Sequence, residues 1–261
     1  MTFLRLLGVF LKIGALHELE YRVNFYIQML RTGIALASGL TGLSIVYSHT
    51  ETLGGWRHAE LLVLLGVYFL GSGIIGVVIQ PSMQRFMEDV RQGTLDFTLT
   101  KPEDAQALVS VRQVAVWKAV DLIVGGVIIA YALVQLERSV GWLAGLSFLL
   151  SLVAGAAIIY AFWLMLATMT FWFVKIDNIL VIFQSMYTAG RWPVGIYPFW
   201  LRTTLTFLVP VAFATTVPAE ALSGRVTPET LLGGVALALV LNALARAFWS
   251  VGVRHYSGAS A

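Results

Sequence analysis

The sequence has no cysteine and few charged residues, and each deficit excludes a class of protein. Without cysteine, the chain cannot form a disulfide, a thiolate metal site or a cysteine nucleophile. Only 12% of its 261 residues are charged, about half of the ~25% that is usual in soluble domains. Because 58% of residues are apolar and the mean hydropathy is +0.82, we interpret the chain as an integral membrane protein.

The net charge of +3 does not indicate a nucleic-acid partner. The basic residues lie singly between apolar runs, and no basic patch is visible. They favour the side that would hold both chain ends, as the positive-inside rule expects. We therefore expect a multi-pass protein of the cell (inner) membrane with both termini in the cytoplasm, which requires an even number of crossings.

Apolar runs of sufficient length predict an all-α protein of about six transmembrane helices, since a span needs about 20 residues. The expected spans are 25–47, 60–80, 114–136, 142–174, 176–189 and 231–251. A seventh run, 199–217, contains Arg202 and Pro210. Backbone that turns inside a membrane must be buried in protein or face water. An even count requires that one of the two irregular runs, 176–189 or 199–217, is re-entrant. Arg202 and Pro210 make 199–217 the better candidate for a hairpin at the outer face.

We expect one transmembrane domain over residues 1–261, with three special segments. Residues 1–24, where Arg5 and Lys12 share a helix face, are predicted to be an interfacial helix. Residues 82–112 are predicted to be a cytoplasmic segment. Residues 193–228 are predicted to be the re-entrant outer segment.

The cytoplasmic segment carries apolar residues where water is expected. Gly93 can end the helix that continues the second span, and Pro102 fits the first turn of a new helix. Between them, Leu95, Phe97 and Leu99 alternate with polar residues. Such side chains either dock on a partner or pack back on the helix ends, and the residues alone leave both interpretations open.

Apart from residues at their ends, such as Glu60 and Lys118, two ionisable residues lie clearly within the first four spans, Arg31 and Asp121. Intramembrane charges are functional candidates. Arg31 can instead extend to the inner headgroups, and Asp121 is expected to pair with Lys118, three residues earlier on one helix.

Glycines at two places predict close helix packing. They are Gly71, Gly73 and Gly76 in the second span, and Gly125 and Gly126 in the third.

Two stretches resemble the permeases of type-2 ABC exporters. Residues 93–102 read Gly-Thr-Leu-Asp-Phe-Thr-Leu-Thr-Lys-Pro, and that family shows a glycine, a leucine-rich stretch around Asp, and then Lys-Pro or Arg-Pro. Residues 197–202 and 207–213, Tyr-Pro-Phe-Trp-Leu-Arg and Phe-Leu-Val-Pro-Val-Ala-Phe, resemble its re-entrant segment. The resemblance covers nearly the whole chain. Arg191 departs from it, because an uncharged residue is expected before Trp192 and Pro193.

The resemblance implies a transport subunit rather than an enzyme. Two six-span chains, identical or related, would pair around a substrate path, and each would bind an ABC ATPase subunit. The chain has no G-x-x-x-x-G-K-[ST] phosphate loop, so ATP and Mg²⁺ are expected on that partner and no cofactor on this chain. The residues implied to contact the ATPase are Gly93, Leu95, Asp96, Phe97, Leu99, Thr100, Lys101 and Pro102.

Candidate residues of the substrate path are Arg31, Tyr187, Arg191, Trp192 and Trp200. An aromatic belt at the membrane interface explains the aromatic members equally well.

Other classes of membrane protein are open alternatives. A lipid-modifying enzyme needs ionisable residues clustered at one depth, and a channel needs a ring-forming filter; neither pattern is visible. A non-transporting scaffold would explain the cytoplasmic segment as well as a permease does. Since the histidines lack metal-ligand spacing and the serines lack a base in a triad pattern, neither a metal site nor a catalytic residue is predicted.

Overall fold

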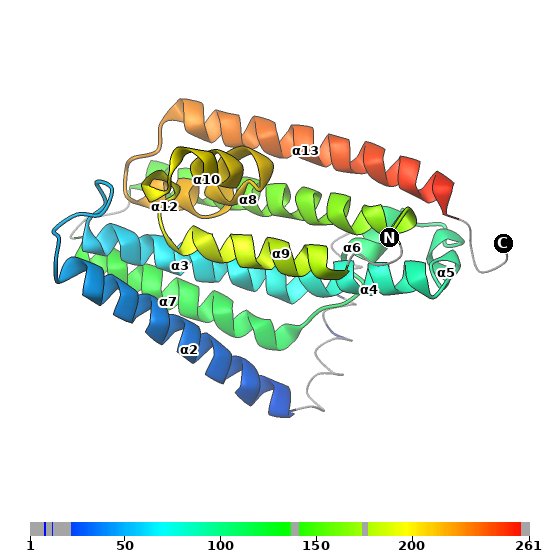
Figure 1. The fold of residues 1–261 in the computed structure, drawn as a ribbon, viewed down its shortest axis with the longest axis horizontal. Coiled ribbons are helices and arrows are strands. Elements are labelled where there is room, and N and C mark those ends of the chain that lie inside the picture. The colour runs from blue at the N-terminus through cyan, green and yellow to red at the C-terminus, as the bar shows by residue number, and fades with distance from the viewer. Residues whose placement is uncertain (1–7, 9–11, 13–21, 137–140, 174–176, 257–261) are drawn as a thin grey trace.

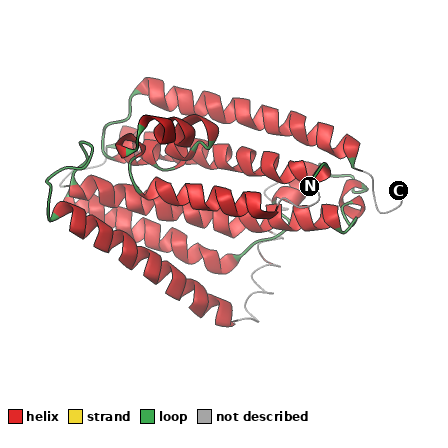
Figure 2. Ribbon diagram, in the orientation of Figure 1, coloured by secondary structure: helices red, strands yellow, loops and turns green. Residues whose placement is uncertain are grey.

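The computed structural model describes residues 8, 12, 22–136, 141–173 and 177–256 (Figure 1). Within these ranges the regular elements are helices, and the only other pairing is an isolated bridge between Leu53 and Trp56 (Figure 2). The predicted all-α membrane fold is confirmed. The predicted interfacial helix of residues 1–24 lies largely outside the described residues.

Five helical stretches of the described chain are long and apolar enough to cross a membrane. They are α2 (Arg22–Tyr47), α3 (His58–Ile74) with its continuation α4 (Gln80–Arg91), α7 (Ala119–Gln135), α8 (Trp142–Thr168) and α13 (Pro228–His255). They lie side by side, and α2 begins and α13 ends toward the end of the bundle that carries α5 (Asp96–Leu99) and α6 (Ala105–Ser110) (Figure 1). We call this the α5 end.

The α3–α4 helix is the centre of the bundle. In its most apolar stretch 67% of residues are buried, against 17% in α2 and in α13. The helix runs for 34 residues, which corresponds to about 50 Å and exceeds the ~30 Å hydrocarbon core of a bilayer. It is therefore longer than one crossing needs.

This helix passes through Pro81 because a π-helical turn, Ile75–Ile79, precedes the proline. Proline has no N–H and clashes with the carbonyl four residues earlier. Here that carbonyl belongs to Val77, and it accepts a hydrogen bond from the Ala115 N–H at 2.9 Å. The broken helical bond is thus replaced by a bond to the chain that leads into α7.

A bent pair of short helices follows α9 (Asp177–Thr188). It consists of α10 (Phe199–Thr203) with a π turn (Thr204–Leu208), then α11 (Val211–Ala214) with α12 (Thr216–Leu222). The two halves meet at a bend of 68°. The bend is at Pro210, one of the two residues expected to interrupt a plain span.

Both flanks of the bent pair contact the loop between α2 and α3. Ile196 packs on Gly54, where an added Cβ would lie 2.8 Å from Ile196 Cγ2. Arg225 donates to the Gly55 carbonyl and pairs with Glu60 of α3 at 3.5 Å. Because the segment starts and ends at the same loop, it has the shape of a hairpin. An even count of crossings would then also need the predicted span 176–189, where the structure has the 12-residue helix α9, which is not among the five long helices. Its position relative to a bilayer stays a prediction.

Single cysteines test this position cleanly, because the chain has no native cysteine. Gly195 and Glu229 flank the hairpin and are exposed, and exposed Lys101 lies at the α5 end. We expect Gly195→Cys and Glu229→Cys to react with a membrane-impermeant maleimide on intact cells, and Lys101→Cys to react only after permeabilisation. Labelling of Gly195→Cys and Glu229→Cys from opposite sides would show that the bent pair is a crossing.

Glycine packing is confirmed where α3 meets α7. A Cβ on Gly125 would lie 2.7 Å from both the Gly66 carbonyl oxygen and the Leu70 nitrogen. Gly73 is similarly close to Leu122. The prediction is wrong for Gly126, whose Cβ would meet nothing within 4 Å, because successive helix residues point about 100° apart.

Candidate functional site

The helix α4 ends where the sequence predicts, because Gly93 adopts a φ of +69°. This left-handed backbone is favourable for glycine and is common just after a helix. The N–H groups of Thr94 and Leu95 then both donate to the Asp89 carbonyl, at 2.9 and 3.2 Å. The chain is thereby folded back against the end of α4.

Asp89 anchors the segment that follows. Its side chain is fully buried, and its carboxylate forms an ion pair with Arg85 Nε at 3.1 Å. The carboxylate also accepts hydrogen bonds from Thr94 Oγ1 at 3.1 Å and from Arg112. Arg112 also donates to Thr98 Oγ1 at 2.9 Å. A buried carboxylate is stable when it is paired and hydrogen-bonded in this way. One side chain therefore joins α4, the returning segment and the chain after α6.

The sequence analysis did not single out Asp89. Its only local signal was the four-residue spacing from Arg85, which places the two side chains on one helix face. The pairing with Arg112 spans 23 residues and depends on the turn at Gly93.

The expectation of a water-facing loop at residues 94–100 is wrong, because Asp96–Leu99 form the single helical turn α5. Residues four apart share a helix face. Leu95 and Leu99 therefore pack inward, and Leu95 is 0% exposed. Phe97 points away from the fold and is 73% exposed. Of the two interpretations left open, packing holds for the leucines, and only the phenylalanine is available to a partner.

The exposed part of this segment is small. It consists of Phe97, Thr100, Lys101 and Pro102, and we call it the tip. The expected first-turn position of Pro102 is wrong, since α6 begins three residues later with Asp104 as its N-cap. The Asp104 side chain accepts a hydrogen bond from a first-turn N–H at 2.9 Å, as expected of an N-cap residue.

Two candidate path residues meet at Tyr68 of α3. Tyr187 is fully buried, stacks on the Tyr68 ring at 5.3 Å and donates to the Tyr68 carbonyl at 3.2 Å. The Arg191 guanidinium lies over the same ring, 5.0 Å from its centroid. Within this chain, both residues hold the end of α9 against α3.

The other candidate path residues lie apart from one another. Trp192 packs on Gly42 of α2, and with Arg191 it borders a cavity of about 70 Å³. Arg31 on α2 and Trp200 on α10 are exposed. Their roles in a substrate path stay predictions.

Asp121 has different partners from the one expected. It is buried, and it accepts hydrogen bonds from Thr32 at 2.5 Å, Gln28 at 3.3 Å and Ser72 at 3.4 Å. No ion pair with Lys118 is present among the described side chains. Donors from α2 and α3 thus replace the local lysine and fasten α2 to the bundle. The spacing of Gln28 and Thr32, four residues apart in an apolar span, was the available signal.

The long apolar helices and the hairpin define a multi-pass, helical membrane protein. The chain matches the family described as ABC-2 family transporter protein over residues 34–260 and belongs to that family. It is a transmembrane permease of an ABC transporter, as the resemblance implied. No match was found among curated proteins or among solved structures.

Proposed function

We propose that the chain is the permease half of an ATP-driven exporter of the cell membrane, working with a separate ATPase subunit and a second permease chain. The observation that carries this proposal is the exposed tip held on a buried ionic anchor. A partner that binds Phe97 and moves it would also displace Asp89. Hydrogen bonds through the Thr94 and Arg112 side chains connect the segment that carries the tip to the Asp89 carboxylate.

The anchor is well placed to pass such a movement into the membrane. Asp89 lies on α4, which is continuous with the central helix α3. A second connection joins α6 to α13, where Arg246 pairs with Asp104. Movement of the tip would therefore reach two of the membrane-spanning helices.

The orientation follows from charge. Arg85 and Arg91 lie on α4, Lys101 follows α5 and Arg112 follows α6, so all four belong to the α5 end. Loops rich in Lys and Arg stay in the cytoplasm. This supports an orientation in which the tip faces the cytoplasm, where an ATPase can bind it, and the hairpin lies at the outer face. The export direction, and the pairing of two permease chains, rest on the family resemblance.

Phe97→Ala tests the proposed contact. An exposed aromatic side chain at the centre of a small interface contributes about 2 kcal/mol or more, so we expect at least a tenfold loss of ATPase binding. Thermal unfolding of the permease should not change, because Phe97 makes little contact with its own chain. The measurement is recovery of a nucleotide-binding subunit with the tagged chain from its native membrane in mild detergent, read by mass spectrometry.

Phe199→Ala is the matched control, since Phe199 is 84% exposed but lies on the hairpin. It should retain the ATPase. If Phe97→Ala retains the ATPase as wild type does, the tip is not the contact. If wild type recovers no ATPase under conditions that preserve a known ABC exporter, the exporter proposal itself is contradicted.

A further inference from the structure

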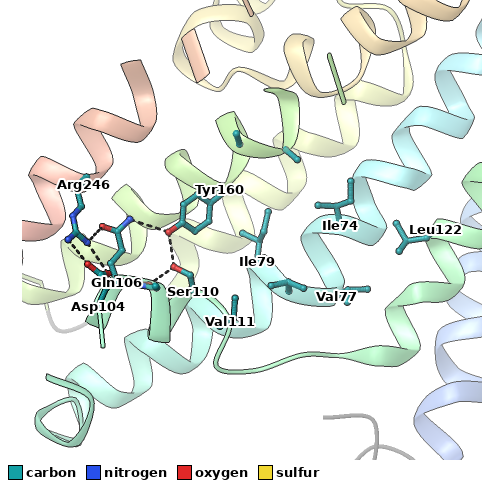
Figure 3. Close-up of a pocket in the computed structure, with 14 residues that line it drawn as sticks. Ile74, Val77, Ile79, Asp104, Gln106, Ser110, Val111, Leu122, Tyr160 and Arg246 are labelled. Carbon is teal, nitrogen blue, oxygen red and sulfur yellow. Dashed lines mark hydrogen bonds and ion pairs between the residues drawn. The ribbon is translucent and has the colours of Figure 1, made fainter. Parts of the chain in front are cut away.

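A cavity of about 640 Å³ lies near the α5 end of the described bundle, outside the anchor and the candidate path residues (Figure 3). Its walls come from the π turn of the second span and from α6, α7, α8 and α13. The volume is within the range of about 300–1,000 Å³ that small-molecule sites occupy.

The two ends of this cavity differ in chemistry. Ile74, Val77 and Leu122 form an apolar end that lies between α7 and the π turn (Figure 3). At the other end, Arg246 and Asp104 form an ion pair. The polar end is therefore at the N-cap of α6, where the chain leaves the spans, and the apolar end is deeper in the bundle.

A hydrogen-bond network orders the polar end. Arg246 donates to Asp104 Oδ1 at 3.0 Å and to Gln106 Oε1 at 2.9 Å. Gln106 in turn donates to the Tyr160 hydroxyl at 3.2 Å, which lies 2.7 Å from Ser110 Oγ. The network joins residues from α6, α8 and α13, so the polar groups are fixed relative to the apolar walls.

The ion pair between Arg246 and Asp104 leaves N–H donors of Arg246 that can bind a ligand. Bonds to described residues use three of the five N–H donors of Arg246. The two side chains are 52% and 46% exposed. The hydrogen bond from Arg246 holds the pKa of Asp104 below its usual value, so the carboxylate remains charged at neutral pH. The polar end thus presents adjacent positive and negative charges with no net charge.

We propose that this cavity binds a zwitterionic membrane phospholipid. The acyl chain lies along Ile74, Val77 and Leu122, the phosphate accepts from the unused Arg246 donors, and the ammonium approaches Asp104. An anionic headgroup would be attracted by Arg246 but repelled by the Asp104 carboxylate. A lipid without a charged headgroup would form neither ionic interaction. The inference does not depend on the proposed exporter function, because it concerns equilibrium binding by the permease chain.

The test compares defined lipids added to the purified, delipidated full chain in detergent. We expect phosphatidylethanolamine to bind saturably in native mass spectrometry and to raise the melting temperature. Phosphatidylglycerol and diacylglycerol should bind at least tenfold more weakly. Arg246→Gln should weaken phosphatidylethanolamine binding at least tenfold, whereas Arg254→Gln, an exposed arginine on the same helix outside the cavity, should not.

A second pair of variants tests the apolar part of the cavity. Ala156→Phe on α8 fills the cavity, and Val153→Phe adds the same ring to an exposed position of that helix. Only Ala156→Phe should prevent binding. If Ala156→Phe does not fold, the double variant Arg246→Gln with Asp104→Asn removes both charges without adding volume and gives the same expected loss.

Three results would overturn the proposal. One is equal binding by the Arg246 and Arg254 variants. Another is preference for the anionic or the headless lipid. The third is the absence of saturable binding by any of the lipids, which would leave the cavity to be covered by a protein surface.

Discussion

Replacing Asp89 with alanine should release the segment between α4 and α6 and, under the proposed function, abolish stimulation of the ATPase partner. The variant leaves Arg85 and Arg112 without the carboxylate that both contact. Removing one member of a buried ion pair costs about 3–5 kcal/mol, and we expect about 2–3 kcal/mol here because the arginine side chains are 42% and 28% exposed. Hydrogen–deuterium exchange of residues 93–100 and thermal unfolding in detergent measure the local and global effects.

Glu88→Ala is the control for Asp89→Ala. Glu88 is the neighbouring acidic residue, and it bonds only to Arg91 and Gln92 among its described neighbours. Exposed pairs of this kind contribute less than about 1 kcal/mol, so exchange at residues 93–100 should match wild type. Equal exchange in the Asp89 and Glu88 variants would show that the segment is held by its turn at Gly93 and not by the carboxylate.

Most of the fold follows from apolar run length. In lipid, backbone groups must bond within the chain, which only helices and closed barrels achieve. Runs of about 20 apolar residues favour helices, and the five long helices lie where such runs predicted them, whereas the run 199–217 forms the bent pair. The sequence predicted that the second span continues as a helix to Gly93, but it could not predict how the helix passes Pro81. The passage depends on the distant Ala115 N–H, which donates a hydrogen bond to the Val77 carbonyl in place of the N–H that Pro81 lacks.

The candidate site was predictable in position but not in detail. Gly93 marks the helix end by its conformational preference, which is a local property. Leu95 is buried and Phe97 is exposed because the segment is helical and not extended. An extended chain alternates sides every residue, whereas one helical turn places residues four apart together. Seven residues carry too little pattern to distinguish the two.

Polar contacts between helices were the least predictable part. The sequence suggested Lys118 as the partner of Asp121 because that pair is local. The side chains that donate hydrogen bonds to Asp121 in the structure are instead 49 to 93 positions away. The same holds for Arg246 and Asp104, which are 142 positions apart. Which helices are neighbours decides such pairs, and the apolar runs that predict each helix do not contain that information.

Adding one methyl group at Gly125 should destabilise the bundle, whereas the same change at Gly126 should not. In Gly125→Ala, the new Cβ would meet the Gly66 carbonyl oxygen and the Leu70 nitrogen, each at 2.7 Å. Both are backbone atoms of α3, so no side-chain rotation relieves the clash, and α3 and α7 must move apart. We expect a loss of about 1–3 kcal/mol, the usual range for overpacking.

Gly126→Ala is a matched control, since it changes the adjacent glycine of the same helix to the same residue. Its Cβ would meet nothing within 4 Å, and alanine is more favourable than glycine inside a helix by about 0.5–1 kcal/mol. Its melting temperature in detergent should therefore equal or exceed that of wild type. Opposite signs for the two substitutions would establish that α3 and α7 touch through their backbones in the membrane. A loss of the same size at both positions would instead indicate that neither position of α7 tolerates an added methyl group.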